Sequence, residues 1–199
     1  MAKTFLFDIG NVILFFDFQI AAQKIASESN LSPADALKEV SPLTDDLETG
    51  LLDPETFIEK ASFKIGYSGT QDRFREAFEA IFELNESMVQ FITERHAEGA
   101  SLHLLSNTNG IHVPYFESAY RVFDLFEGRI YSHQVGCMKP DPEIYEITIN
   151  QLGINPSETI YIDDLPANCE AGRQVGLTTI PYQRGHHECF LSSYRNLIA

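Results

Sequence analysis

The sequence predicts an α/β protein built on a doubly wound parallel sheet with a small helical cap inserted after the first strand. Short apolar segments recur along the second half of the chain, and helical segments separate them. Strands that alternate with helices in this way form parallel sheets covered on both faces. The chain between Asp17 and Leu84 instead has helical spacing, which predicts the cap.

The first predicted strand lies in "FLFDIGNVILFF", Phe5 to Phe16, and is almost wholly apolar. Such a run is typical of a strand buried on both faces. Asp8 interrupts it, and Gly10 and Asn11 break the strand just afterwards. Because an unpaired charge is costly to bury, we expect Asp8 at the carboxyl end of the strand, in contact with solvent, a metal or a cation. The alternative is a turn aspartate that caps the next segment.

Helical segments fill the next part of the chain. Ser32 and Asp53 each precede a proline, which predicts two helix N-termini. A later helix is expected to carry one apolar face, made by Phe74, Phe78, Ile81 and Phe82. We predict no strand between Asp17 and Leu84. The expected division is therefore residues 1–16 and 89–199 for the core and residues 17–88 for the cap.

Strands and helices alternate after Asn85, which is expected to cap a helix ending at Gly99. Strands are then predicted in "SLHLLSNTN", at the end of "RVFDLFEGRIYSHQV", in "TIYIDD" and in "TTIPY". Helices are predicted in "DPEIYEITINQLGI", "NCEAGRQVGL" and "FLSSYRNLIA". Two of these strands end in polar pairs, Ser106-Asn107 and Asp163-Asp164, and a loop carries Lys139 before a proline. Since parallel strands end at one edge of their sheet, we expect these side chains to gather there with Asp8.

Together these side chains suit a phosphate monoester. A divalent cation held by Asp8 and the Asp163-Asp164 pair would screen the repulsion between carboxylate and phosphate, and hard oxygen ligands favour magnesium. Lys139 would neutralise a phosphoryl oxygen, and Ser106 would orient another. Taken singly, each residue has a simpler explanation: a strand end, a surface lysine, or a helix start that attracts carboxylates.

Composition narrows the classes of partner. Fourteen basic and 29 acidic residues give a net charge of −15, which argues against nucleic acid and anionic membranes. The apolar run at the N-terminus is too short to span a bilayer. Three widely spaced cysteines do not resemble a disulfide framework, so we expect a reduced, cytoplasmic protein. The expected state is a monomer or a homodimer.

Four motifs in order, "DIGNV", "LSNTN", "KPDPEIY" and "IDDLPANCEAG", resemble those of the haloacid dehalogenase (HAD) superfamily. The resemblance spans residues 4 to 182, and it implies a Rossmann-like core with a cap after the first motif. Within the superfamily the chain looks closest to bacterial sugar phosphatases of the alpha-glucose-1-phosphatase type. The resemblance therefore implies a magnesium-dependent phosphatase acting on a small phosphorylated metabolite, with a sugar phosphate as one candidate.

The resemblance also implies a role for each motif residue. Asp8 would attack phosphorus and form an aspartyl-phosphate, and Lys139 would stabilise both Asp8 and the transferring group. Ser106 and Asn107 would bind the phosphoryl group. The metal would be held by Asp8, the backbone carbonyl of Gly10 and Asp164, with Asp163 as a second ligand or as an anchor behind the metal ligands.

The chain departs from the superfamily pattern at Gly10, where phosphatases usually carry a second aspartate as general acid and base. Asp17 is a possible substitute, although it is also placed to cap a helix. Dehalogenases also lack that aspartate, so a 2-haloacid dehalogenase is one alternative, opposed by the Asp163-Asp164 pair. A non-catalytic HAD-like protein that binds phosphate compounds is another.

Overall fold

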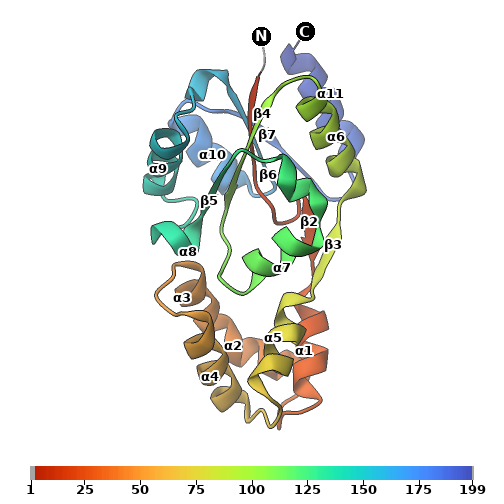
Figure 1. Cartoon of the computed structure of the whole chain (residues 1–199), viewed down its shortest axis with the longest axis vertical. Helices are drawn as coiled ribbons and strands as arrows, with labels where there is room; N and C mark the ends of the chain where they lie inside the picture. Colours follow the sequence, from red (N-terminus) through yellow and green to blue (C-terminus); the bar gives the residue numbers. More distant parts are fainter. Residues whose placement is uncertain (1–2, 199) are drawn as a thin grey trace.

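A five-stranded parallel sheet with the strand order β5-β4-β1-β6-β7 forms the centre of the protein. The structure is a computed structural model that describes residues 3–198. Figure 1 shows the sheet and its helices at one end of the molecule, together with both chain ends, and a helical region at the other end. The strands are β1 (Thr4–Phe7), β4 (Ser101–Ser106), β5 (Gly128–Tyr131), β6 (Thr159–Asp163) and β7 (Thr178–Pro181).

Helices cover both faces of this sheet, as predicted. One face packs against α6 (Glu86–Ala97), α7 (His112–Ala119) and α11 (His187–Ile198), and the other against α9 (Pro142–Leu152) and α10 (Pro166–Gln174). Shorter turns complete the core: η2 (Arg121–Leu125), α8 (Ser132–Val135) and η3 (Pro156–Glu158). The doubly wound α/β fold expected from the sequence is confirmed.

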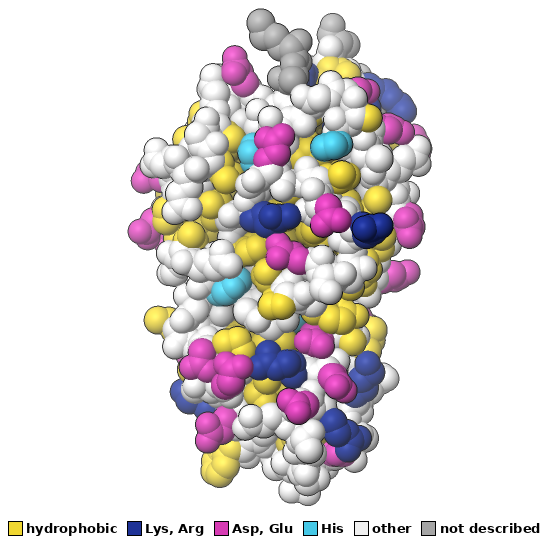
Figure 2. Space-filling model, in the orientation of Figure 1, with side chains coloured by type: hydrophobic (Ala, Val, Ile, Leu, Met, Phe, Trp, Pro, Cys, Tyr) yellow, Lys and Arg dark blue, Asp and Glu magenta, His cyan; other side chains and the backbone are white. Residues whose placement is uncertain are grey.

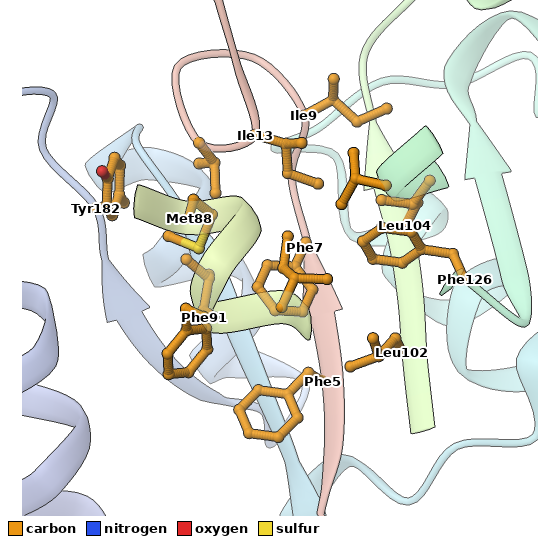
Figure 3. Close-up of a cluster of buried hydrophobic side chains, with 14 of the residues drawn as sticks. Phe5, Phe7, Ile9, Ile13, Met88, Phe91, Leu102, Leu104, Phe126 and Tyr182 are labelled. Carbon is orange, nitrogen blue, oxygen red and sulfur yellow. The ribbon is translucent and has the colours of Figure 1, made fainter. Parts of the chain in front are cut away.

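Alternation along the strands divides the core into two layers. Phe5 and Phe7 of β1 belong to the layer under α6 and α11, whereas Leu6 belongs to the layer under α9 and α10. Figure 3 shows Phe5 and Phe7 beside Phe91 and Leu104 in the first layer. Both faces of β1 are thus apolar, because side chains alternate between two buried faces.

The helical region has its own apolar core. It contains α1 (Phe18–Ala26), α2 (Pro33–Val40), η1 (Ser41–Leu43), α3 (Thr44–Glu48), α4 (Pro54–Ile65) and α5 (Gln71–Glu79). Ser32 caps α2 and Asp53 caps α4, each directly before a proline, as predicted. Phe57, Phe74 and Phe78 are buried among these helices.

The segment after α5 differs from the prediction, because it contains a strand. The helix ends at Glu79, and β3 (Phe82–Leu84) pairs antiparallel with β2 (Leu14–Phe16). The apolar run from Phe5 to Phe16 therefore contains parts of two strands, β1 and β2, whereas the sequence predicted a single strand. Pairing between residues far apart in the chain outweighs the helical spacing that extended through Phe82.

The two-stranded ribbon of β2 and β3 joins the helical region to the sheet. The predicted core boundary at residue 89 falls within α6, whose Met88 is buried in the core of the sheet. We propose that the cap ends before α6. Within residues 3–198, no helix is long and apolar enough to cross a membrane.

Acidic and basic side chains are interspersed over the face of the molecule in Figure 2. The acidic net charge of −15 is therefore not gathered into one block on that face. That face therefore offers no broad positive surface to an anionic partner.

Candidate active site

The register of the sheet brings the first and the last predicted carboxylates together. Leu6 of β1 pairs with Tyr161 of β6, and Phe7 pairs with Ile162. Continued by one residue, the same register places Asp8 beside Asp163 at the carboxyl ends of both strands. The Asp8 backbone N–H donates to the Ile162 carbonyl over 2.9 Å.

Lys139 lies between these two carboxylates. Its Nζ is 2.9 Å from Asp8 Oδ1 and 2.7 Å from Asp163 Oδ2, and it also donates to the Leu105 carbonyl over 3.1 Å. The Lys139 side chain is 1% exposed. The predicted nucleophile and the predicted lysine are therefore in direct contact, in a buried position.

Burial and charge compete at this cluster. Burial alone would lower the pKa of Lys139, but the negative charges of Asp8 and Asp163 outweigh it and raise that pKa above its usual value. Burial raises the pKa of Asp8 to about 7, against the opposing effect of Lys139 and with a contribution from Asp163. One ammonium group thus serves two buried carboxylates, and Asp8 is the less stabilised of the two.

Asp163 is fully buried and its carboxylate is saturated with donors. It accepts from Lys139 Nζ, from the Tyr161 hydroxyl, from the Leu165 N–H at 2.8 Å and from Asn168 Nδ2 at 3.0 Å. Burial would raise the pKa of Asp163, but Lys139 and these hydrogen bonds hold it below its usual value. A carboxylate has about four lone-pair positions, so these donors occupy the acceptor capacity of Asp163.

The Asp164 carboxylate has fewer hydrogen bonds than that of Asp163. Its Oδ2 accepts one hydrogen bond, from Asn11 Nδ2 at 3.0 Å. Burial raises the pKa of Asp164, opposed by Asn11 and reinforced by Asp163. Asn11 has a φ of +54°, a left-handed conformation that asparagine tolerates better than most residues.

The carboxylates fit a hard divalent cation. Asp8, Asp163 and Asp164 each offer an oxygen within 4.8 Å of the others. Among residues 3–198 no backbone N–H is seen to donate to the Gly10 carbonyl, which leaves that oxygen free to act as a ligand. Magnesium prefers oxygen ligands of this kind.

Ser106 and Asn107 lie at the end of β4, beside Lys139. The Asn107 side chain makes two hydrogen bonds to the backbone of Lys139. Its Oδ1 accepts from the Lys139 N–H at 2.8 Å, and its Nδ2 donates to the Lys139 carbonyl at 2.9 Å. Within the described part of the chain, the Ser106 hydroxyl makes a single long contact, 3.4 Å, to the Asn107 carbonyl. Ser106 is therefore free to reorient toward a ligand, whereas the Asn107 side chain already positions Lys139.

A small cavity opens from this edge toward the cap. Its lining includes Gly10, Ser106, Asn107 and one cap carboxyl, Glu48 at the end of α3. The rest of the lining is mainly apolar: Ile9, Phe16, Phe18, Ile81, Phe82 and Phe116, with Thr108 and His112. Burial raises the pKa of Glu48 to about 7, with further contributions from Asp45 and Asp8.

Glu48 was not anticipated from the sequence. The acidic run "TDDLE" gives no sign of which carboxylate faces the core, so only the packing of α3 identifies it. Asp17, the candidate that the sequence offered, is the N-cap of α1 and accepts from the Gln19 N–H at 2.8 Å. The capping alternative for Asp17 is therefore confirmed.

The parallel sheet, its carboxylate cluster and the buried lysine define an α/β enzyme that carries its chemistry at the carboxyl edge of the sheet. Residues 2–176 match the family described as haloacid dehalogenase-like hydrolase. The chain belongs to that family, as the four motifs predicted.

Named relatives cover nearly the whole chain. A D-ribitol-5-phosphate phosphatase of Bacteroides thetaiotaomicron is 28% identical over 195 residues, which are 93% of this chain and 94% of the relative. A sesquiterpene phosphatase of Aspergillus oryzae is 24% identical over 181 residues, 88% of this chain and 87% of the relative.

A solved structure has the same fold. It is a HAD family enzyme of Bacteroides thetaiotaomicron in complex with magnesium and inorganic phosphate, with a TM-score of 0.82 and 25% identity. The superposition covers 94% of this chain and 96% of that structure. These relatives agree with the hydrolase class that the sequence motifs predicted.

Proposed function

We propose that this protein is a magnesium-dependent phosphatase that hydrolyses a small phosphorylated metabolite through an aspartyl-phosphate on Asp8. The observation that carries the proposal is the contact of Lys139 with Asp8 and Asp163 at the end of parallel strands. The phosphatase names of the relatives, and the magnesium and phosphate in the solved structure, support the same class.

Asp8 is suited to be the nucleophile. One of its oxygens, Oδ1, is held by Lys139 and by the Ile9 N–H at 2.7 Å, which orients the carboxylate. No hydrogen bond to Oδ2 is seen among residues 3–198, so this oxygen is free to attack phosphorus. Lys139 then balances negative charge on both Asp8 and the incoming phosphoryl group.

We assign metal ligation to Asp8, Asp164 and the Gly10 carbonyl. Asp163 would act behind them, because its carboxylate is already occupied by Lys139, Tyr161, Leu165 and Asn168. When bound, magnesium supplies positive charge that lets the anionic ester approach anionic Asp8. Ser106 would orient a phosphoryl oxygen.

The substrate is proposed to be a small phosphate monoester, with a polyol or sugar phosphate as the first class to test. The ribitol-5-phosphate phosphatase supports that choice. The alternative of a haloacid dehalogenase is disfavoured by the three clustered carboxylates, since a neutral carbon–halogen bond needs no metal to offset anionic charge.

The test is release of phosphate from p-nitrophenyl phosphate and from a panel of sugar and polyol phosphates. We expect turnover with magnesium and none with a chelator. Asp8→Asn should lower turnover on the order of 10³-fold or more, because it removes the nucleophile. Asp72→Asn, an exposed carboxylate on α5, is the matched control and should be unaffected.

Three results would contradict the proposal: equal activity with and without the chelator, an active Asp8→Asn protein, or halide release from haloacetate without phosphate release. Complete inactivity toward every ester, with magnesium and phosphate still bound, would instead favour a non-catalytic phosphate-binding protein.

A further inference from the structure

Glycine at position 10 leaves the proposed reaction without its usual proton donor, an inference that rests on the proposed phosphatase function. Transfer of a phosphoryl group to Asp8 leaves an alkoxide that needs a proton unless it is a stable anion. A Cβ on Gly10 would lie 3.1 Å from the Phe16 ring, so the phenyl group takes the space beside that position. The donor must therefore come from elsewhere in the cavity.

Most polar side chains of the cavity are already committed. Asn107 is paired at both ends with the Lys139 backbone. Both ring nitrogens of His112 are occupied, by Asn109 at 3.0 Å and by the Phe78 carbonyl at 3.1 Å. Serine and threonine hydroxyls are too weakly acidic to serve as proton donors at neutral pH.

Glu48 is the exception. Among residues 3–198 its carboxyl group has no hydrogen bond or ion pair, although it lines the same cavity as Gly10 and Ser106. Glu48 is half-buried, and a carboxyl group that is partly withdrawn from water and has no positive partner holds its proton more tightly than one in water. Its surroundings therefore favour a carboxylic acid that is available to a substrate.

The position of Glu48 is fixed by how α3 packs against the core. Leu47 is buried in the cap, and Gly50 approaches the carbonyl of His133 so closely that no Cβ could fit there. His133 and Ser132 of α8 in turn bond to Thr108, which follows the phosphate-site residues of β4. Figure 1 shows α3 directly facing α8. Through α8, these contacts position the end of α3 relative to the end of β4.

We propose that Glu48 is the general acid and base of this enzyme, supplied by the cap in place of an aspartate at position 10. In the first step the Asp8 Oδ–P bond forms, the bond from phosphorus to the leaving oxygen breaks, and the Glu48 proton moves to that oxygen. In the second step water attacks phosphorus, its proton returns to Glu48, and the Asp8 Oδ–P bond breaks. Both steps balance, and Glu48 ends in its starting form.

Charged and titratable groups around Glu48 are consistent with this cycle. Asp45 on the same helix and Asp8 at the end of β1 favour its acid form, and Lys139 favours the carboxylate that remains after transfer. Burial lowers the pKa of His112 on α7 to about 4 and also lowers that of His133 on α8, so both rings are neutral at pH 7. Neither histidine competes as the proton donor.

The test compares leaving groups in wild type and Glu48→Gln, with p-nitrophenyl, phenyl and n-propyl phosphate. For such a covalent mechanism kcat/KM reports the first step, since loss of the leaving group commits the enzyme. We expect kcat/KM to fall about 10²–10³-fold for the propyl ester and less than about tenfold for p-nitrophenyl phosphate, which needs little protonation. With p-nitrophenyl phosphate, kcat and KM should fall together while a hydroxylamine-sensitive phosphoprotein accumulates.

Glu59→Gln is the matched control, because Glu59 is an exposed glutamate of the same cap, on α4, with no ion pair among residues 3–198. An equal loss on all three esters, or no loss, would overturn the role of Glu48 and leave the proposed phosphatase function standing. A wild-type protein that releases no phosphate from any ester with magnesium would overturn both.

Discussion

The carboxylates at the sheet edge and the carboxyl of Glu48 in the cap differ in how many hydrogen-bond and ion-pair partners they have. At the sheet edge, Asp8 and Asp163 share Lys139, and Asp163 has further donors in Tyr161 and Asn168. In the cap, Glu48 lines a cavity of mixed apolar and polar residues and has no hydrogen-bond or ion-pair partner among residues 3–198. Asp163 and Lys139 thus have their partners before any substrate arrives, whereas the Glu48 carboxyl has none among residues 3–198.

This difference suggests a division of labour. Groups that must hold one geometry through the whole reaction gain from rigid, mutually paired surroundings. A group that must lose and regain a proton gains from surroundings in which both of its states are accessible. The sheet edge matches the first requirement, and the wall of the cavity matches the second.

Removing the shared cation should produce the largest effect. Lys139→Met leaves Asp8 and Asp163 buried without their ammonium partner, and breaking a buried pair in this way costs about 3–5 kcal/mol of unfolding free energy. Phosphatase activity should be lost as well. Urea denaturation at pH 7 measures the first effect. Lys60→Met, at an exposed site on α4, should change neither. A Lys139→Met protein as stable as wild type would mean that the two carboxylates are neutralised in some other way.

The next largest effect should distinguish Asp163 from Asp164 in stability and in the response to magnesium. Asp163→Asn replaces an acceptor of several charged and neutral donors, so we expect a loss of about 2–3 kcal/mol without magnesium. Asp164→Asn removes a carboxylate with a raised pKa and should leave the metal-free protein at least as stable as wild type. Adding magnesium should raise the melting temperature of Asp163→Asn but not that of Asp164→Asn. The reverse pattern would make Asp163 the direct ligand.

The sheet edge could be predicted from sequence because its signals are local. Asp8, Ser106 and Asp163 each follow an apolar strand, and parallel strands end at a common edge whatever their order. Lys139 lies outside a strand, in a loop that ends at a proline, and its Nζ lies between Asp8 and Asp163 at the same edge. The local pattern could not indicate which donors saturate Asp163, because Asn168 reaches it only through the packing of α10.

The cap was less predictable for a related reason. Its helices were expected from their spacing and caps, but Glu48 acquires its place only when the short α3 docks on α8 at Gly50. Phe82 likewise fits a helical face in sequence, yet lies in β3 because β2 is available to pair with it. Both outcomes depend on contacts between segments that are distant in the chain, which periodicity does not record.

The smallest expected effect is a pH dependence of stability that belongs to Glu48. Burial raises the pKa of Glu48 from 4.5 to about 7. Below about pH 4.5 the folded and unfolded states both hold the proton. As pH rises toward 7 only the unfolded state releases it, so stability declines through this window. Asp8, whose pKa is also raised to about 7, contributes a decline of the same sign.

In metal-free protein, the melting temperature of Glu48→Gln should therefore fall less between pH 5 and pH 8 than that of wild type, while Glu59→Gln follows wild type. Identical slopes for Glu48→Gln and wild type would show that Glu48 is ionised across this range, and the contrast between cap and sheet edge would disappear.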